Sequence, residues 1–492
     1  MNASEAASRE PCYGLPLRNF GLSLTSKVVS LVAHIAFVML TARLFSKEEV
    51  AVIAVTGIAT ILMDACRGLG LGTLLLKRLP QMGAAPAGES QRLIATYLFY
   101  SCLPPLLLTL AGLALPAWSE FGASGHRKAL ELGLVLSLFT VLSNSNMLIL
   151  QASQKFGHLA AMTLITAALQ RLVPCVAAAW FGAKLEPFLL WSAAAAAVAF
   201  GATCIPILPM LRPWRFQVLD WDEFWPESRH FFGTSLLRYG TTQVDQLFVA
   251  VLFPPATLAV YFMLRRLYSL GVVLIGSMID ALVPELAQQA STDAAAARRR
   301  LTEWSRLSLF AGSAGAALLA GNGSAVIEIL LGPGYGDDTL LIALFAATTS
   351  LYFLYCLVQV DMLLFQAPER VLWMAGATAA ANLLAGPLTS RWLGVHSIPL
   401  SMLAGYLLGL VVARWRGGPG PASRPVWRLR ELGAGIAVVM LSSLAPAAAQ
   451  HSPLNEWERT LAVNFVIAGM VAAHFWRNRV GDSLRRVVQR AA

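Results

Sequence analysis

Long apolar runs follow one another along almost the whole chain, and they constrain its fold more than any other feature. Each run reaches the length of about 20 residues that a helix needs to cross the hydrocarbon core of a bilayer. The runs lack the strict alternation of apolar and polar residues found in barrel strands, so the spans are predicted to be helices. Composition agrees, because 57% of the 492 residues are apolar and only 13% are charged. The sequence therefore predicts an all-α integral membrane protein.

Fourteen transmembrane helices are predicted, arranged as two six-helix lobes and a C-terminal helix pair. The first lobe is expected at 20–211, the second at 230–413 and the helix pair at 431–476. The remaining parts are an N-terminal tail (1–19), a linker (212–229), a basic loop (414–430) and a basic C-terminal tail (477–492), all expected in the cytoplasm. The spans are expected at about 20–43, 50–76, 92–115, 129–151, 158–181, 188–211, 230–253, 257–283, 306–331, 338–364, 371–390, 396–413, 431–449 and 457–476.

The distribution of basic residues predicts the orientation of these spans. With the N-terminus inside, 24 of the 37 Lys and Arg residues fall on the cytoplasmic side, 7 fall outside and 6 lie within spans. Cytoplasmic loops of membrane proteins carry such an excess of basic residues. The bias therefore supports both the number of spans and cytoplasmic N- and C-termini.

The two lobes repeat one another weakly. "FGLSL" from Phe20 opens the first lobe and "FGTSL" from Phe232 opens the second, and "EVAVIA" and "TLAVYF" occupy matching places in the two second helices. Parallel repeats related by an axis along the membrane normal are typical of transporters, whose substrate site lies between the repeats. The pattern therefore favours a transporter.

Several other classes of function find no support in the sequence. The net charge of +10 does not indicate a nucleic-acid partner, because the basic residues cluster beside apolar runs. The N-terminal stretch lacks the apolar core of a signal peptide. The six cysteines are scattered, and no two have the spacing of a metal site or a disulfide framework. Neither a metal site nor a catalytic centre is expected.

Charges inside the predicted spans are the strongest indication of a functional site. Arg238 and Asp245 are seven residues apart, close to two helical turns, and so are predicted to face the same side of one helix. Lys27 and His34 have the same spacing in the first lobe. A charge at the bilayer centre costs roughly 3 kcal/mol on insertion scales. Lys27 and Arg238 lie close enough to a span end to extend to the headgroups, whereas the shorter and deeper Asp245 does not.

Three further sets of charges have alternative interpretations. Asp64 and Arg67, three residues apart on a helix, either neutralise one another or take part in a site. Arg171 has no carboxylate within one turn, which favours a role facing a cavity. Arg265 and Arg266 point about 100° apart, so only one of them can face a cavity well.

The remaining polar residues of the spans are ambiguous or structural. The amides of the fourth span are expected to bond either sugars or neighbouring helices. Glu328 and Asp361 lie near span ends and are expected to contact water. The amides of the fourth span are Asn144, Asn146 and Gln151. Three tryptophans are expected to anchor the linker at the membrane interface, and they are Trp214, Trp221 and Trp225.

Several stretches, taken in order, resemble the Wzx-type polysaccharide flippases of the multidrug/oligosaccharidyl-lipid/polysaccharide exporter superfamily. In the first lobe they are "LTARLFSKEEVAVIAV" and "GLGLGTLLLKR". In the second lobe they are "FGTSLLRYGTTQVDQLFVAVLFPPATLAVYFMLRRL", "LVPELAQ", "ILLGPGYGDD" and "AANLLAGPLTSRWLG". The resemblance covers residues 20–415. Ala51 stands where the family usually has Gly, and "WLGVHSIPL" lacks the family's Gly-x-x-Gly-Ala run; these departures bear on the substrate more than on the fold.

The resemblance implies two lobes around a central cavity that opens alternately to the two sides of the bacterial cytoplasmic (inner) membrane. The implied cargo is a polyprenyl-diphosphate-linked oligosaccharide for a cell-surface polysaccharide, such as an exopolysaccharide or the O-antigen of lipopolysaccharide. A polysaccharide polymerase and glycosyltransferases are the implied partners, besides membrane lipid. The chain has no GxxxxGK(S/T) motif, so no cofactor is expected, and transport is either passive or coupled to protons or sodium.

Such a cargo needs cationic groups for its diphosphate and hydrogen-bonding groups for its sugars. A basic residue is frequent in the family near Arg266, which favours it over Arg265. Asp245→Asn is expected to leave the protein folded and to reduce transport. The predicted cavity residues are Lys27, His34, Arg67, Arg171, Arg238 and Arg266, and the predicted ion-coupling carboxylates or charge partners are Asp245 and Asp64.

Two kinds of alternative stay open. A drug or organic-cation exporter, or a lipid II flippase, would share the fold and differ in cargo. A membrane polymerase or ligase would need catalytic groups in a sizeable outer loop, and the predicted outer loops are short. The sequence does not identify the glycan, the coupling ion or the oligomeric state.

Overall fold

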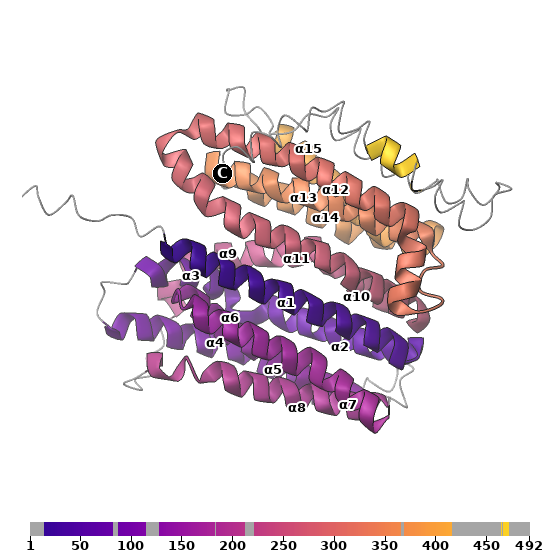
Figure 1. The fold of residues 1–492 in the computed structure, drawn as a ribbon. Helices are drawn as coiled ribbons and strands as arrows, with labels where there is room; N and C mark the ends of the chain where they lie inside the picture. Colours follow the sequence, from indigo (N-terminus) through magenta and orange to yellow (C-terminus); the bar gives the residue numbers. More distant parts are fainter. Residues whose placement is uncertain are drawn as a thin grey trace, which may run out of the picture. The chain divides into compact units, whose positions relative to one another are not determined.

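The computed structural model of the protein describes residues 14–81, 87–114, 127–182, 184–211, 221–365, 369–415, 464 and 466–471. All regular structure in these residues is helical (Figure 1). Eight of the described helical stretches are long and apolar enough to cross a membrane. The all-α membrane fold predicted from the sequence is therefore confirmed.

The twelve spans predicted between residues 20 and 413 each coincide with one helix or with consecutive helices. One of the eight apolar stretches, Arg370–Trp415, holds two of these predicted spans. The predicted final pair, 431–476, lies outside the described residues except for 464 and 466–471, which are helical. Within that piece Ile467 packs against Ala317, and the amide of Asn322 donates to Asn464 Oδ1 at 2.8 Å.

The chain divides into two compact units, which are described separately. Unit 1 comprises residues 1–37 and 62–232, and unit 2 comprises residues 38–61 and 233–492. Two helices, α1 (Gly14–Leu44) and α2 (Lys47–Cys66), thus contribute to both units. The lobe boundaries expected from the sequence stay a prediction.

Unit 1 is built around the pairing of α5 with α8 and a core of leucines and aromatic rings. Fully buried side chains of this core include Leu71, Leu75, Tyr97 and Phe224. Besides parts of α1 and α2, its helices are α3 (Leu71–Gln81), α4 (Ala87–Ala114), α5 (Arg127–Ala152), α6 (Phe156–Ala167), α7 (Val173–Phe181), α8 (Leu185–Cys204) and α9 (Trp221–Thr242), the last of which continues into unit 2.

Unit 2 packs α14 against α15 and α12 against α13, with α13 also contacting α11 and α15 (Figure 1). Three tyrosines, Tyr352, Tyr355 and Tyr406, pack against one another in its core, with ring centroids 5.0–6.4 Å apart. Its helices are α10 (Val244–Leu252), α11 (Pro255–Thr292), α12 (Ala294–Leu331), α13 (Thr339–Phe365), α14 (Glu369–Leu393) and α15 (Ser397–Trp415).

The connection between α1 and α2 is attached to unit 2 by two basic side chains. Lys47 Nζ donates to Gly334 O at 2.9 Å and lies 5.5 Å from the Tyr335 ring centroid, and Arg43 donates to Ile329 O. Gly334 has a φ of 80°, which few residues with a side chain adopt. These contacts explain why residues 38–61 group with unit 2 rather than with the rest of α1 and α2.

Three of the predicted spans are broken. The segment Arg67–Gly70 between α2 and α3 contains three consecutive residues with positive φ, which are Gly68, Leu69 and Gly70. A π-helical segment, Ala168–Leu172, joins α6 to α7 ahead of Pro174. Gln243, with φ −137° and ψ −18°, interrupts the helix between α9 and α10. Broken helices at membrane depth are tolerated where other protein groups satisfy the freed backbone atoms.

Candidate functional site

Each of the three breaks carries a charged residue that the sequence singles out. Arg67 begins the segment between α2 and α3, Arg171 lies in the π-helical segment, and Asp245 lies in the first turn of α10. Discontinuous helices with half-helix ends near the bilayer midplane form the substrate and ion sites of many transporters. The coincidence of charges with breaks therefore marks these places as candidate functional sites.

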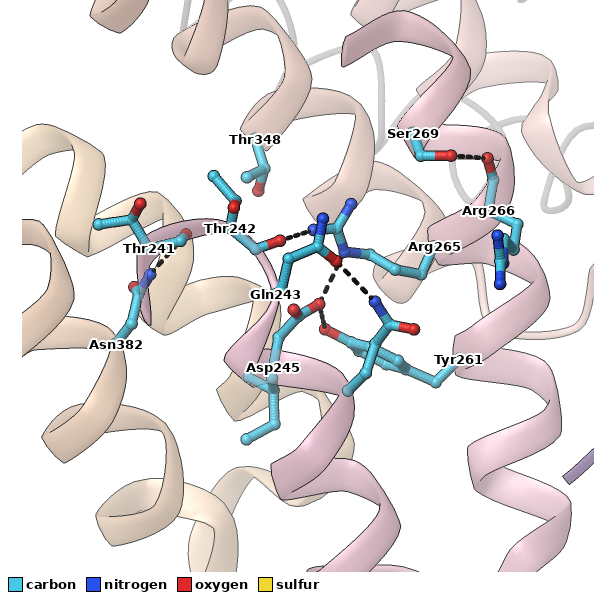
Figure 2. Close-up of polar contacts among 12 residues, drawn as sticks. Thr241, Thr242, Gln243, Asp245, Tyr261, Arg265, Arg266, Ser269, Thr348 and Asn382 are labelled. Atoms are coloured by element: carbon cyan, nitrogen blue, oxygen red, sulfur yellow. Dashed lines mark hydrogen bonds and ion pairs between the residues drawn. The ribbon is translucent and has the colours of Figure 1, made fainter. Parts of the chain in front are cut away.

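The break at Gln243 leaves two carbonyl groups of α9 to be satisfied by side chains. Asn382 Nδ2 on α14 donates to Thr241 O at 3.0 Å, and Tyr406 Oη on α15 donates to the same oxygen at 3.4 Å. The Arg265 guanidinium donates through Nη2 to Thr242 O. Figure 2 shows Asn382 and Arg265 approaching the two carbonyls from different helices.

Asp245 and Arg265 form a buried ion pair at this break. Arg265 Nε lies 2.7 Å from Asp245 Oδ2, and the Tyr261 hydroxyl donates to the same oxygen at 2.8 Å (Figure 2). Asp245 is 2% exposed and Arg265 is 4% exposed. The guanidinium also lies over the Tyr268 ring, with Cζ 4.5 Å from its centroid. Every group in this cluster belongs to unit 2, so the charge of Asp245 is balanced within that unit.

The expectation that Arg238 and Asp245 share one helix face stays a prediction, because the helix between them is interrupted. The seven-residue spacing assumes an uninterrupted helix, and Gln243 breaks the helix between the two residues. The side chain of Arg238 lies outside the described residues, as does that of Lys27 in α1. The structure therefore brings Asp245 together with Arg265, whereas the sequence favours Arg266 over Arg265.

The short connection between α10 and α11 is a sequence signal from which the Asp245–Arg265 pair could have been predicted. α10 and α11 are joined by only Phe253 and Pro254, so they form a tight antiparallel hairpin. In such a hairpin, residues at similar distances from the turn come to lie opposite one another. Asp245 lies 8 residues before Phe253 and Arg265 lies 11 residues after Pro254, a difference of less than one helical turn, whereas Arg266 is rotated about 100° away from Arg265.

Arg266 is placed differently from its neighbour. Its Cζ lies 4.8 Å from the Phe262 ring centroid, and a Cβ built on Gly57 of α2 would come within 3.1 Å of its Nη2. Arg266 is half-buried, whereas Arg265 is fully buried. Its predicted role in a cavity stays a prediction.

In unit 1, Asp64 and Arg67 form the ion pair that their spacing suggested. Arg67 Nε lies 3.1 Å from Asp64 Oδ1, immediately before the break between α2 and α3. Arg171 Nη1 donates to the hydroxyl of Ser30 on α1 at 2.9 Å and also to the Ser30 carbonyl. His34, one helical turn beyond Ser30 on α1, is buried.

Other polar residues of the spans have structural partners. Asn146 donates to Thr203 Oγ1 at 3.0 Å, which links α5 to α8. Asp361 was expected to contact water but is 3% exposed and pairs with Arg298 at 3.2 Å, because the first turns of α12 cover it. Glu328 is exposed as expected. Among the described residues no group of three His, Cys, Asp or Glu side chains could hold a metal ion.

Comparison with known proteins gives one family and one fold. A family model described as polysaccharide biosynthesis protein matches residues 40–337. No curated protein matches the chain. The fold resembles the lipid II flippase MurJ in an inward closed conformation, with 12% identity, a TM-score of 0.67, and coverage of 94% of this chain and 100% of that chain.

Two MATE transporters have the same fold. An inward-facing multidrug resistance MATE family transporter of the MOP superfamily is 14% identical, with a TM-score of 0.57 over 81% of this chain and 98% of that chain. A Vibrio cholerae MATE transporter is 14% identical, with a TM-score of 0.56 over 80% of this chain and 94% of that chain. At these identities the likenesses show the fold, and the substrate has to be argued from other observations.

Proposed function

Because the chain belongs to the polysaccharide biosynthesis protein family, we propose that it is a flippase for a lipid-linked oligosaccharide. The cargo in this proposal is a polyprenyl-diphosphate-linked oligosaccharide, moved from the cytoplasmic to the outer leaflet of a bacterial inner membrane by alternating access. The family match over residues 40–337 is the observation that carries the proposal, and the fold supports it. The transported oligosaccharide is the building block of a cell-surface polysaccharide made by the Wzx-dependent route, such as an exopolysaccharide or O-antigen. A polymerase and glycosyltransferases are the partners in this proposal.

The chemistry of such a cargo fits the basic residues at the breaks in unit 1. A diphosphate needs cationic hydrogen-bond donors, and a guanidinium carries five N–H groups in a planar fork. Arg171 is half-buried in the π-helical segment, where Ser30 holds one of its terminal nitrogens. We assign to Arg171 a contact with the diphosphate.

The other predicted cavity residues keep their roles in this proposal. Lys27, Arg238 and Arg266 add positive charge for the diphosphate, and His34 adds a hydrogen-bonding ring for sugar or phosphate. Arg67 is paired with Asp64 at 3.1 Å, so it contributes less net charge than the others. ATP hydrolysis by this chain is not part of the mechanism, since the chain contains no GxxxxGK(S/T) motif.

Lipid II is a second candidate cargo. MurJ, a lipid II flippase, shares the fold of this chain with a TM-score of 0.67 over 94% of it, so lipid II is the cargo that has to be distinguished from a polysaccharide repeat unit. Lipid II and a polysaccharide repeat unit share a polyprenyl diphosphate and differ in the attached sugars. A test of function therefore has to identify the glycan as well as its movement.

A deletion strain tests the proposal and identifies the glycan in the same sample. In cells that lack this gene and retain the glycosyltransferases, complete lipid-linked oligosaccharide should accumulate and resist an external glycosidase. Mass spectrometry of the extracted lipid then separates a polysaccharide repeat unit from lipid II. Full-length units that reach the outer leaflet and remain unpolymerised would contradict the proposal and indicate a polymerase or ligase. A strain with no accumulated lipid-linked species would contradict it in favour of a drug exporter.

A further inference from the structure

We infer that Arg265 is the built-in counter-cation of Asp245 and that the pair locks the break between α9 and α10. In this arrangement the charge of Asp245 is compensated inside unit 2 without a bound metal cation and without protonation of the carboxylate. Asp245 is then a positioning residue for the broken helix rather than an ion-coupling carboxylate. The inference rests on contacts within unit 2 and is independent of the cargo.

The charge of the buried Asp245 carboxylate is balanced by its neighbours. An ionised carboxylate away from water is very costly unless an opposite charge and hydrogen bonds compensate it. Arg265 Nε at 2.7 Å and the Tyr261 hydroxyl at 2.8 Å supply both compensations to Oδ2. Since Arg265 is 4% exposed, its guanidinium in turn needs Asp245. Neither charge can leave or be neutralised without leaving the other uncompensated.

The charges of Asp245 and Arg265 lie at the two helix ends that meet at the break. Asp245 lies in the first turn of α10, where the unpaired N–H groups of a helix favour a negative charge. Arg265 donates to the carbonyl of Thr242, the last residue of α9, where unpaired carbonyls favour a positive charge. The pair therefore stabilises both half-helix ends at once and, together with the donors from Asn382 and Tyr406 to Thr241 O, holds the break at Gln243.

The second carboxylate oxygen of Asp245 differs from the first. Oδ1 is buried, and none of the described residues donates a hydrogen bond to it. This oxygen would be the place for a coupling proton or cation. With the guanidinium already on Oδ2, a second cation on the same carboxylate meets like-charge repulsion in a site of low dielectric. An ion is expected there only when Arg265 is removed.

The experiment measures thermal unfolding of the purified full-length protein in nanodiscs. Each variant is unfolded in sodium chloride and in choline chloride at equal ionic strength, and at mildly acidic and neutral pH. For the wild type we expect the same Tm in both salts at each pH. For Arg265→Gln we expect a Tm lower by about 5 °C or more, as for a buried charge that has lost its partner, with partial recovery in sodium or at acidic pH.

Two further variants isolate the pair. Arg266→Gln removes the same charge one residue further along α11, where the guanidinium lies over the Phe262 ring, and should show no sensitivity to salt or pH. The double variant Asp245→Asn with Arg265→Gln should also be insensitive, and it should be more stable than either single variant. The double variant also keeps the test decisive if Arg265→Gln alone does not fold, because rescue by Asp245→Asn demonstrates the coupling.

Hydrogen exchange gives a local readout that general destabilisation does not mimic. Amides of residues 241–247 should exchange about a hundredfold faster in Arg265→Gln than in the wild type, and at unchanged rates in Arg266→Gln. A wild-type protein that sodium or acid stabilises, with loss of that effect in Asp245→Asn, would overturn the inference. Equal stability of the double variant and the less stable single variant would overturn it as well. None of these readouts involves transport, so they are distinct from a failure of the proposed function.

Discussion

Asp245 illustrates how a single residue's role depends on the partner that the fold supplies. Its position in an apolar span made it a candidate for ion coupling or for a charge pair, and Arg265, 20 residues later, supplies the pair. Removal of one partner of a buried ion pair costs about 3–5 kcal/mol. Asp245→Asn, which is expected from the sequence to leave the protein folded, should therefore lower its stability, and reduced transport in that variant does not by itself indicate ion coupling.

The Tyr261 hydroxyl provides a prediction at this scale. Tyr261→Phe removes its hydrogen bond to Asp245 Oδ2 and should destabilise the protein by about 1.5–3 kcal/mol, the range for hydrogen bonds to charged groups. Tyr335→Phe is the matched control, because the Tyr335 hydroxyl is buried and no described residue bonds it. Its removal should be neutral or slightly stabilising. Thermal unfolding of both variants in nanodiscs tests the prediction, and equal losses in the two would contradict it.

At the scale of elements, hydropathy predicts where the helices lie and fails to predict where they break. The apolar runs predicted the twelve spans up to residue 413, because the bilayer requires about 20 apolar residues per crossing whatever the detailed packing. The break at Gln243 has no Pro or Gly at the position itself, and partners on α11, α14 and α15 determine it. Tertiary contacts of this kind are not readable from local sequence.

The break before α3 is the exception, since its glycines are visible in the sequence "RGLG". Gly70 has a φ of 84°, and a Cβ there would lie 2.3 Å from Ser228 O and 2.5 Å from Phe232 N. Hydropathy alone predicted one continuous span, 50–76, through this stretch. The glycines were the sequence signal for this break. The close approach of Gly70 to α9 explains why a residue without a side chain is needed there.

Gly70→Ala is the prediction at this scale. The substitution forces a side chain into a left-handed conformation and against backbone atoms, so it should cost more than about 2 kcal/mol. Gly201→Ala is the control, because a Cβ at Gly201 in α8 meets nothing within 4 Å. Fluorescence-detected size-exclusion chromatography after heating measures the fraction of monodisperse protein. This fraction should be smaller for Gly70→Ala than for Gly201→Ala. Equal heat resistance of both variants would show that Gly70 does not approach Ser228 this closely.

At the scale of the whole molecule, the charge asymmetry of the loops predicts the orientation in the membrane. The excess of basic residues, 24 against 7, predicts a cytoplasmic N-terminus. Two exposed lysines, Lys155 and Lys184, flank α6 and α7 at opposite ends of one predicted span. The predicted orientation puts Lys155 inside and Lys184 outside. In a cysteine-free background, Lys184→Cys should react with a membrane-impermeant maleimide in intact cells, and Lys155→Cys should react only after permeabilisation. The reverse pattern would invert the orientation and with it the direction of transport proposed here.

Movement of the cargo by the purified protein tests the central proposal most directly. The lipid-linked oligosaccharide extracted from the deletion strain is reconstituted with the protein into sealed vesicles, and an impermeant glycosidase is added outside. Flipping should make the oligosaccharide accessible beyond the fraction that faces outward at the start, until nearly all of it is cleaved. Vesicles with Arg171→Gln should reach the same end point more slowly. Cleavage that stops at the initial outward-facing fraction with wild-type protein, as in protein-free vesicles, would contradict the assignment as a flippase.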